Sequence, residues 1–401
     1  MGYVGNIKKL YRISFFHSLI PAYVIERLFW QQRGMTVPMV VYAEIIYALT
    51  VTILEIPSGI LADKFGRKRC LSAYNALAAA ELILLLFANS FWQFALAIFL
   101  AGIGKALSSG SENALLYDSL LHEGRQGDFE KHLGRLSAVD FAGSCIASLS
   151  GGVLANFFCF EFNYVLSIAS MCVAFFITLS LKEPARFTKP EHEISGAMQH
   201  AKQAVKIFRT QPLVFVYCLT GAGLGACMIY LDEFWQILLQ NTGFPVIFFG
   251  VVSAVASMLR MPSQLLAYRL KEKFSYNRIL FCVIGVSIVG YTAIFYTRNW
   301  FCLVPMFLLF AVSGIADPLV TGYLHHRTES HIRATVESFS SLGLRIISAG
   351  AGLLFGYISA AHSIFAGFLL LAAICFGILT GYAIAGKYTR HKRSKQENAA
   401  D

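Results

Sequence analysis

The chain has 401 residues, of which 56% are hydrophobic and only 14% are charged. An ordinary soluble domain has about 25% charged residues, so this composition argues against a single large water-soluble enzyme. It also argues against a disordered chain, which needs low hydrophobicity. The net charge of +10 would suggest nucleic-acid binding in a soluble protein, whereas a membrane protein collects the same excess in its cytoplasmic loops.

Apolar segments follow one another along the whole chain, and most are long enough to cross a bilayer, which takes roughly 20 residues. Because lipid cannot satisfy backbone polar groups, each crossing segment is expected to be a helix. The sequence therefore predicts an all-α membrane protein, with Pro21 and Pro57 as points where helical hydrogen bonding is interrupted. The twelve predicted spans are 11–31, 37–61, 70–88, 91–117, 134–157, 163–181, 210–238, 244–268, 279–297, 300–324, 334–359 and 362–386.

The lysines and arginines indicate the orientation of these spans. Of the 33 basic residues, 27 fall in the even-numbered connections, in the two termini or, as Arg12 and Arg135 do, in the first two residues of an adjoining span. The odd-numbered connections hold only Arg33 and Arg298, and the remaining four lie within spans. By the positive-inside rule, we predict a multi-pass protein of the cytoplasmic (inner or plasma) membrane with both termini in the cytoplasm.

A polar connection over 186–209 divides the twelve predicted spans into two sets of six. We therefore predict an N-terminal six-helix bundle at 1–185, a cytoplasmic linker at 186–209, and a C-terminal six-helix bundle with a short basic tail at 210–401. The halves also repeat each other, since 56–64 (IPSGILADK) lines up with 261–269 (MPSQLLAYR). Many secondary transporters are built from such repeats, with the substrate site between them.

The connection after the second span carries the most specific motif, 59–69 (GILADKFGRKR). Gly59 would permit close helix approach and Gly66 suits a sharp turn. Asp63 can pair with Arg67 or face the positive N-terminus of another helix. The motif, with Lys68 in its basic run, resembles the loop signature of the major facilitator superfamily. In that family the aspartate locks the two bundles together in the outward-facing state. A loop that only fixes topology is the alternative.

Two further segments resemble the same superfamily. The glycines of the fifth span are similar in spacing to an antiporter motif of drug–proton exchangers, although Ala147-Ser148 stands where that motif has Gly-Pro. Small residues that pack helices together are the alternative. The segment 109–120, which includes Asp118 as a further gating candidate, looks together with 333–338 like a bacterial branch with many efflux permeases. The four glycines of the antiporter-like motif in the fifth span are Gly134, Gly143, Gly151 and Gly152.

Several charged residues fall inside predicted spans, where a charge at mid-bilayer costs about 2.5–3.5 kcal/mol. Such residues should face a cavity or a partner. We expect Asp140 and Glu112 to carry protons, with Glu55 as a third candidate. Lys105 shares a helical face with Ser108, Ser109 and Glu112. It is either an anchor for an anionic substrate group or a structural partner of Glu55 or Glu81.

The remaining substrate-binding candidates lie in both halves. Arg260 and Arg345 would either bind substrate or neutralise Asp317 and Glu337. Tyr23 belongs to the aromatic residues that could line a pocket for an apolar or aromatic substrate, and Glu26 is a charge within the first span.

Other classes of chemistry find little support. The nine cysteines show no CxxC spacing, so we expect no disulfide scaffold and no metal site. A phosphate loop is excluded at Lys105, because Phe99 and Ala106 replace the required glycine and Ser/Thr. We expect no cofactor, no enzymatic activity and no nucleic-acid partner. The expected partners are a small-molecule substrate, protons and the lipid bilayer, with the chain acting as a monomer.

The resemblance implies two pseudo-symmetric six-helix bundles that rock around a central cavity. We expect an alternating-access transporter that exports a small organic molecule, driven by protons. One alternative is uptake or export of an anionic carboxylate metabolite or siderophore. Another is a membrane sensor or scaffold that transports nothing.

Overall fold

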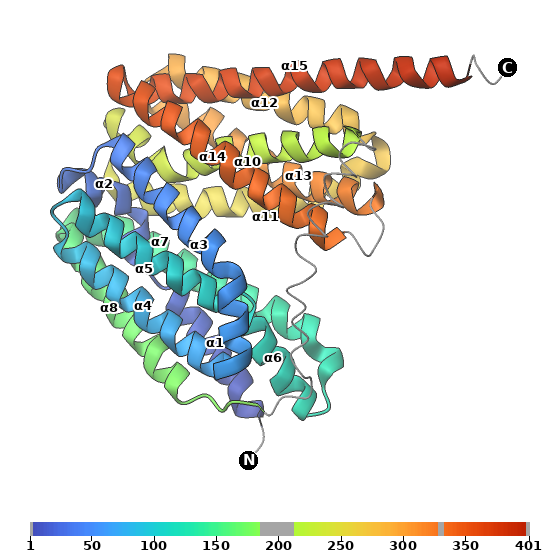
Figure 1. The fold of residues 1–401 in the computed structure, drawn as a ribbon. Coiled ribbons are helices and arrows are strands. Elements are labelled where there is room, and N and C mark those ends of the chain that lie inside the picture. The colour runs from blue at the N-terminus through green and yellow to red at the C-terminus, as the bar shows by residue number, and fades with distance from the viewer. Residues whose placement is uncertain (1–2, 185–211, 328–332, 398–401) are drawn as a thin grey trace. The chain divides into compact units, whose positions relative to one another are not determined.

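The computed structural model describes residues 3–184, 212–327 and 333–397. Over these residues it consists of α-helices, short 3-10 turns and connections, with no strand (Figure 1). Eleven helical segments of the described chain are long and apolar enough to cross a membrane. The predicted all-α membrane fold is therefore confirmed.

The first predicted span is not among these eleven segments, and it is not one continuous helix. Residues 11–31 fall into three pieces: α1 (Val4–Ser18), the 3-10 turn η1 (Pro21–Val24) and α2 (Glu26–Gln32). Pro21 is the first residue of η1, where its missing N–H and fixed φ end the preceding helix. Pro57 and Pro318, in contrast, lie inside helices that continue beyond them.

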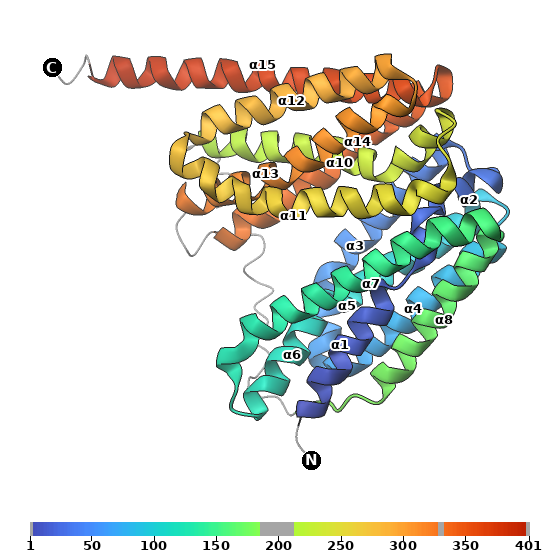
Figure 2. The same ribbon diagram turned by 180° about the vertical axis from the view of Figure 1, so that it is seen from behind.

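The chain divides into two compact units, and the first, unit 1, consists of Met1–His192 with Pro245–Ala254. Within it α5 packs against α3 and α4, while α1 packs against α7 and α8, as Figure 2 shows from behind. Gly66 separates α3 from α4 with a φ of +106° that other residues rarely adopt. The remaining helices of unit 1 are α3 (Val37–Phe65), α4 (Arg67–Phe87), α5 (Phe91–Ser108), α6 (Ser111–His122), η2 (Gln126–Asp128), α7 (Phe129–Phe157) and α8 (Phe160–Leu179).

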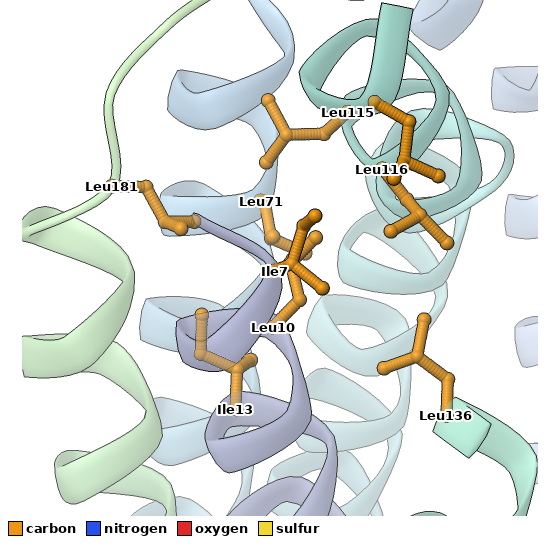
Figure 3. Close-up of a cluster of buried hydrophobic side chains, with 9 residues drawn as sticks. Ile7, Leu10, Ile13, Leu71, Leu115, Leu116, Leu136 and Leu181 are labelled. Carbon is orange, nitrogen blue, oxygen red and sulfur yellow. The ribbon is translucent and has the colours of Figure 1, made fainter. Parts of the chain in front are cut away.

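An apolar cluster holds one end of unit 1 together around α1. Ile7, Leu10 and Ile13 of α1 lie three residues apart and so share one helical face. They meet leucines from α4, α6, α7 and the residues after α8 (Figure 3). Leu10 is fully buried, so its side chain is packed entirely within unit 1. The leucines of this cluster are Leu71, Leu115, Leu116, Leu120, Leu136 and Leu181.

Unit 2 consists of Glu193–Phe244 with Val255–Asp401. In it α10 packs against α13, α14 and α15, and α12 packs against α13 and α15. The rings of Tyr217 and Tyr323 stack with their centroids 3.5 Å apart. Its helices are α10 (Pro212–Asn241), α11 (Phe249–Lys273, whose first turns belong to unit 1), α12 (Tyr276–Thr297), α13 (Leu303–Arg327), α14 (Arg333–Ala361) and α15 (Ile364–Glu397), with the turns η3 (Val246–Phe248) and η4 (Trp300–Cys302). The predicted linker, 186–209, lies outside the described residues.

Candidate functional site

Unit 1 contains a polar cavity of about 400 Å³, which we call the unit 1 cavity. Three of the charged residues predicted from the sequence line it: Lys105 from α5, Glu112 from α6 and Asp140 from α7. His17 from α1 and Tyr74 from α4 also line it. The cavity therefore brings together titratable side chains from five helices, although a hydrophobic bundle would normally exclude them.

The wall between Lys105 and Glu112 differs from the prediction of one continuous helical face. Helix α5 ends at Ser108, and α6 begins at Ser111 after Gly110, whose φ is +75°. That left-handed conformation suits a glycine and breaks the fourth predicted span. Glu112 thus lies in the first turn of α6, where the helix dipole favours a negative charge.

The charges in the cavity influence one another. Asp140 and Lys105 both lie within electrostatic range of Glu112 and of His17. Two carboxylates therefore share one lysine. Among the described residues Lys105 forms no ion pair, so the alternative of a structural pair with Glu55 or Glu81 is not observed.

Two hydrogen bonds fix side chains of the cavity. The Ser18 hydroxyl donates to the Asp140 carboxylate, which joins α1 to α7. The Tyr74 hydroxyl and Nε2 of His17 form a second hydrogen bond, which joins α4 to α1. Neither His17 nor Tyr74 was expected from the sequence. A histidine inside an apolar span was the one signal that could have indicated His17.

Other candidates of the N-terminal half lie elsewhere in unit 1. Glu55 has an exposed side chain on α3 and is not among the residues that line the cavity. Tyr23 of η1 and Glu26 of α2 do not line it either. Instead Glu26 lies 3.9 Å from Arg27, which also contacts Glu44 at 2.7 Å.

The two arginine candidates belong to unit 2. Arg260 of α11 donates to the Asp232 carboxylate at 2.5 Å, and its guanidinium lies 4.8 Å from the ring centroid of Phe310. The structure therefore gives Arg260 a structural partner, though a different one from the predicted Asp317 and Glu337. Arg345 is half-buried on α14.

The predicted gating motif forms a connected set of contacts at the α3–α4 connection. Arg67 donates to the carboxylate of Asp118 on α6 and to the carbonyl of Ala114 at 2.7 Å. The two carboxylate oxygens of Glu183 accept the backbone N–H groups of Arg67 and Lys68, each at 2.8 Å. Glu183 thus caps the N-terminus of α4, where a negative charge is stabilising.

Gly59 and Asp63, two other residues of the gating motif, give less information about its contacts. Within unit 1, a Cβ at Gly59 would have no neighbour within 4 Å, so a close helix approach at Gly59 stays a prediction. The side chain of Asp63 lies outside the described ones.

The glycines of the antiporter-like motif have a packing role in unit 1. A Cβ on Gly143 would lie 2.7 Å from the carbonyl oxygen of Phe15, and one on Gly151 would lie 2.6 Å from that of Pro21. Glycine therefore lets α7 approach the backbone of α1 and η1. At Gly152 a Cβ would meet the backbone of Gly250 at 2.9 Å, whereas at Gly134 it would meet nothing within 4 Å.

These features agree with the resemblance that the sequence indicates, and comparison with known proteins decides the family. The family model of the Major Facilitator Superfamily matches residues 13–336. The chain belongs to this superfamily. As a member of the major facilitator superfamily with membrane-crossing helices, it is a membrane-embedded, multi-pass transporter.

Its similar relatives belong to the same superfamily. The chain is 24% identical to multidrug resistance protein MdtG of Citrobacter koseri over 360 residues, which is 86% of each chain. It is 23% identical to the MFS-type transporter YxaM of Bacillus subtilis over 341 residues, 84% of each chain.

Solved structures support the major facilitator fold. The nucleoside transporter NupG superposes with a TM-score of 0.76 at 14% identity, over 96% of this chain and 98% of that one. A bacterial homologue of the lysosomal transporter Spinster gives a TM-score of 0.70 at 16% identity, over 96% of both chains.

Proposed function

We propose that the protein is a proton-coupled secondary transporter that exports a small organic molecule across the cytoplasmic membrane, with both termini in the cytoplasm. The observation that carries this proposal is the unit 1 cavity, where Glu112 and Asp140 share the single charge of Lys105. The name of the MdtG relatives, multidrug resistance protein, supports export.

The chemistry of the cavity suits an exchange of protons for substrate. With Glu112, Asp140 and Lys105 all charged, the cavity carries one excess negative charge. A proton can neutralise this charge, and so can a cationic substrate, so the two compete for the same carboxylates. Inward proton flow then supplies about 2.3 kcal/mol per elementary charge for a membrane potential of ~100 mV.

Transport in proteoliposomes tests the proposal with three probes of different charge: ethidium as a cation, chloramphenicol as a neutral molecule and carboxyfluorescein as an anion. An imposed pH gradient should drive at least one of them against the flow of protons. Asp140→Asn should abolish this movement, whereas the half-exposed Asp128, ion-paired with Arg125, provides the matched control, Asp128→Asn. Full activity of Asp140→Asn would remove Asp140 from the mechanism.

A second candidate function, transport of an anionic carboxylate compound, rests on Lys105. Its side chain is exposed to the cavity and has no ion-pair partner among the described residues, so it is available to a substrate carboxylate. Lys105→Ala should then impair carboxyfluorescein transport far more than ethidium transport, with Lys131→Ala, at an exposed position in the first turn of α7, as control. An equal loss for both probes would contradict the anchor.

The two transport proposals share one contrary outcome. If none of the three probes moves in the wild-type protein under any gradient, a membrane sensor or scaffold becomes the better explanation. Binding of the same probes, measured as a shift in the unfolding temperature of the purified protein, then shows whether the cavity still takes a ligand.

A further inference from the structure

A second group of charged side chains lies in unit 1, outside the cavity. Glu26 and Arg27 begin α2, Glu44 is on α3 and Glu81 is on α4. Arg27 donates to Glu44 at 2.7 Å and its other terminal nitrogen lies 3.9 Å from Glu26. All three lie within electrostatic range of Glu81. Three carboxylates are thus gathered around one guanidinium.

Glu81 is the most enclosed of these carboxylates. Its residue is only 9% exposed, and within the described parts of the chain no hydrogen bond or ion pair reaches its side chain. It shares the buried face of α4 with Leu82 and Leu85. Titratable groups within electrostatic range of Glu81 also include the hydroxyls of Tyr23 on η1, Tyr74 on α4 and Tyr164 on α8.

The charges in this group do not balance. The guanidinium of Arg27 is engaged by Glu44 and Glu26, so ionised Glu81 would add a further negative charge beside two carboxylates inside a membrane-spanning bundle, which is costly. Arg27 is bonded to Glu44 and close to Glu26, so the unbonded Glu81 carboxylate is the one that a proton neutralises at least cost. An organic cation is a poor alternative, because Glu81 does not line the unit 1 cavity.

The position of Glu81 on α4 links it to that cavity. Tyr74 and Glu81 are seven residues apart, which is two helical turns, so they lie on the same face about 10.5 Å apart along the axis. Tyr74 lines the cavity and bonds to His17 there. One face of α4 therefore carries a titratable group in the cavity and a buried carboxyl group behind it.

We propose that Glu81 is a proton-binding site separate from the substrate cavity, and that it exchanges its proton during transport. The exchange part rests on the proton coupling proposed above, whereas protonation of Glu81 itself can be measured without any substrate. The step is a simple acid–base reaction, in which a proton from water binds one carboxylate oxygen of Glu81 and is later returned to water.

Infrared spectroscopy of the purified full-length protein in lipid tests the protonation directly. The carbonyl stretch of protonated carboxyl groups at neutral pH should lose the intensity of one group in Glu81→Gln. The matched control is Glu161→Gln, because Glu161 is a more exposed carboxylate paired with Arg33 at 2.9 Å, and it should leave the spectrum unchanged. If Glu81→Gln fails to fold, Glu81→Asp should shift that band instead. An unchanged band in both Glu81 variants would overturn the proposal.

Transport separates the proton-exchange role from structural damage. Whichever probe the wild type moves, Glu81→Gln should keep its exchange at equal pH on both sides and lose its accumulation under a pH gradient. Retained gradient-driven accumulation would refute proton exchange at Glu81. If the wild type moves no probe, the transport proposal fails while the infrared result still decides whether Glu81 is protonated.

Discussion

The carboxylate of Glu183 accepts the backbone N–H of Arg67 at 2.8 Å, across 116 positions of sequence. The contact ties the residues that follow α8 to the connection between α3 and α4. Gly66 makes room for it, since a Cβ there would lie 3.0 Å from the Glu183 carboxylate. The acceptor that caps α4 is thus supplied by a residue outside the motif itself.

Removing this cap should destabilise unit 1. Glu183→Gln keeps the shape of the side chain but loses its charge, and loss of a helix N-cap costs about 0.5–2 kcal/mol. We expect a lower midpoint of thermal unfolding in detergent. Glu130→Gln, at an exposed position in the first turn of α7, is the control and should change the midpoint less. Equal midpoints for wild type and Glu183→Gln would contradict the capping role.

Reversing the charge of either Arg67 or Asp118 should be harmful, whereas exchanging the two residues with each other should be better tolerated. Both side chains are largely buried, at 20% and 15% exposure, and a hydrogen bond to a charged group contributes about 1.5–3 kcal/mol. Arg67→Asp and Asp118→Arg should each lower stability and transport. The double exchange should recover part of both. A double variant no better than the worse single variant would show that the pair does not act through its charges.

The close approach of α7 to η1 should make Gly151 intolerant of any side chain. Gly151→Ala would place its Cβ 2.6 Å from the Pro21 carbonyl oxygen, and such overpacking costs about 1–3 kcal/mol. Gly134→Ala, on the same helix with no neighbour within 4 Å, is the matched control. The midpoint of thermal unfolding should fall for Gly151→Ala and not for Gly134→Ala. The same midpoint for both would refute the close packing.

Tyr74→Phe removes one hydroxyl from the unit 1 cavity and should lower both stability and transport. His17 would lose its hydrogen-bond partner, and an unsatisfied polar group costs about 1–3 kcal/mol. We expect lower stability and slower transport of the probe that the wild type moves. Tyr296→Phe, a highly exposed tyrosine, should change neither. Unaltered transport by Tyr74→Phe would exclude a role for this hydrogen bond.

The sequence predicted most of the membrane-spanning helices, and it predicted that two lining residues of the unit 1 cavity lie close together. Lys105 and Glu112 are seven residues apart, so their common location followed from helical spacing, even though Gly110 breaks the helix between them. Asp140 was recognised by its charge inside a span, but its proximity to Glu112 depends on how α6 and α7 pack.

Contacts between distant segments could not be predicted in this way. The bond between Tyr74 and His17 spans 57 positions and that between Glu183 and Arg67 spans 116, so neither leaves a local pattern. Pro21 was recognised as an interruption, but the sequence did not indicate that η1 would replace a full turn of helix.

Proton coupling is tested most directly by recording the internal pH of proteoliposomes while a transported probe is added on one side, with no imposed gradient. The proposal predicts a pH change that reports protons moving opposite to the probe, and loss of this change in Asp140→Asn. Movement of the probe with a constant internal pH in the wild-type protein would contradict it.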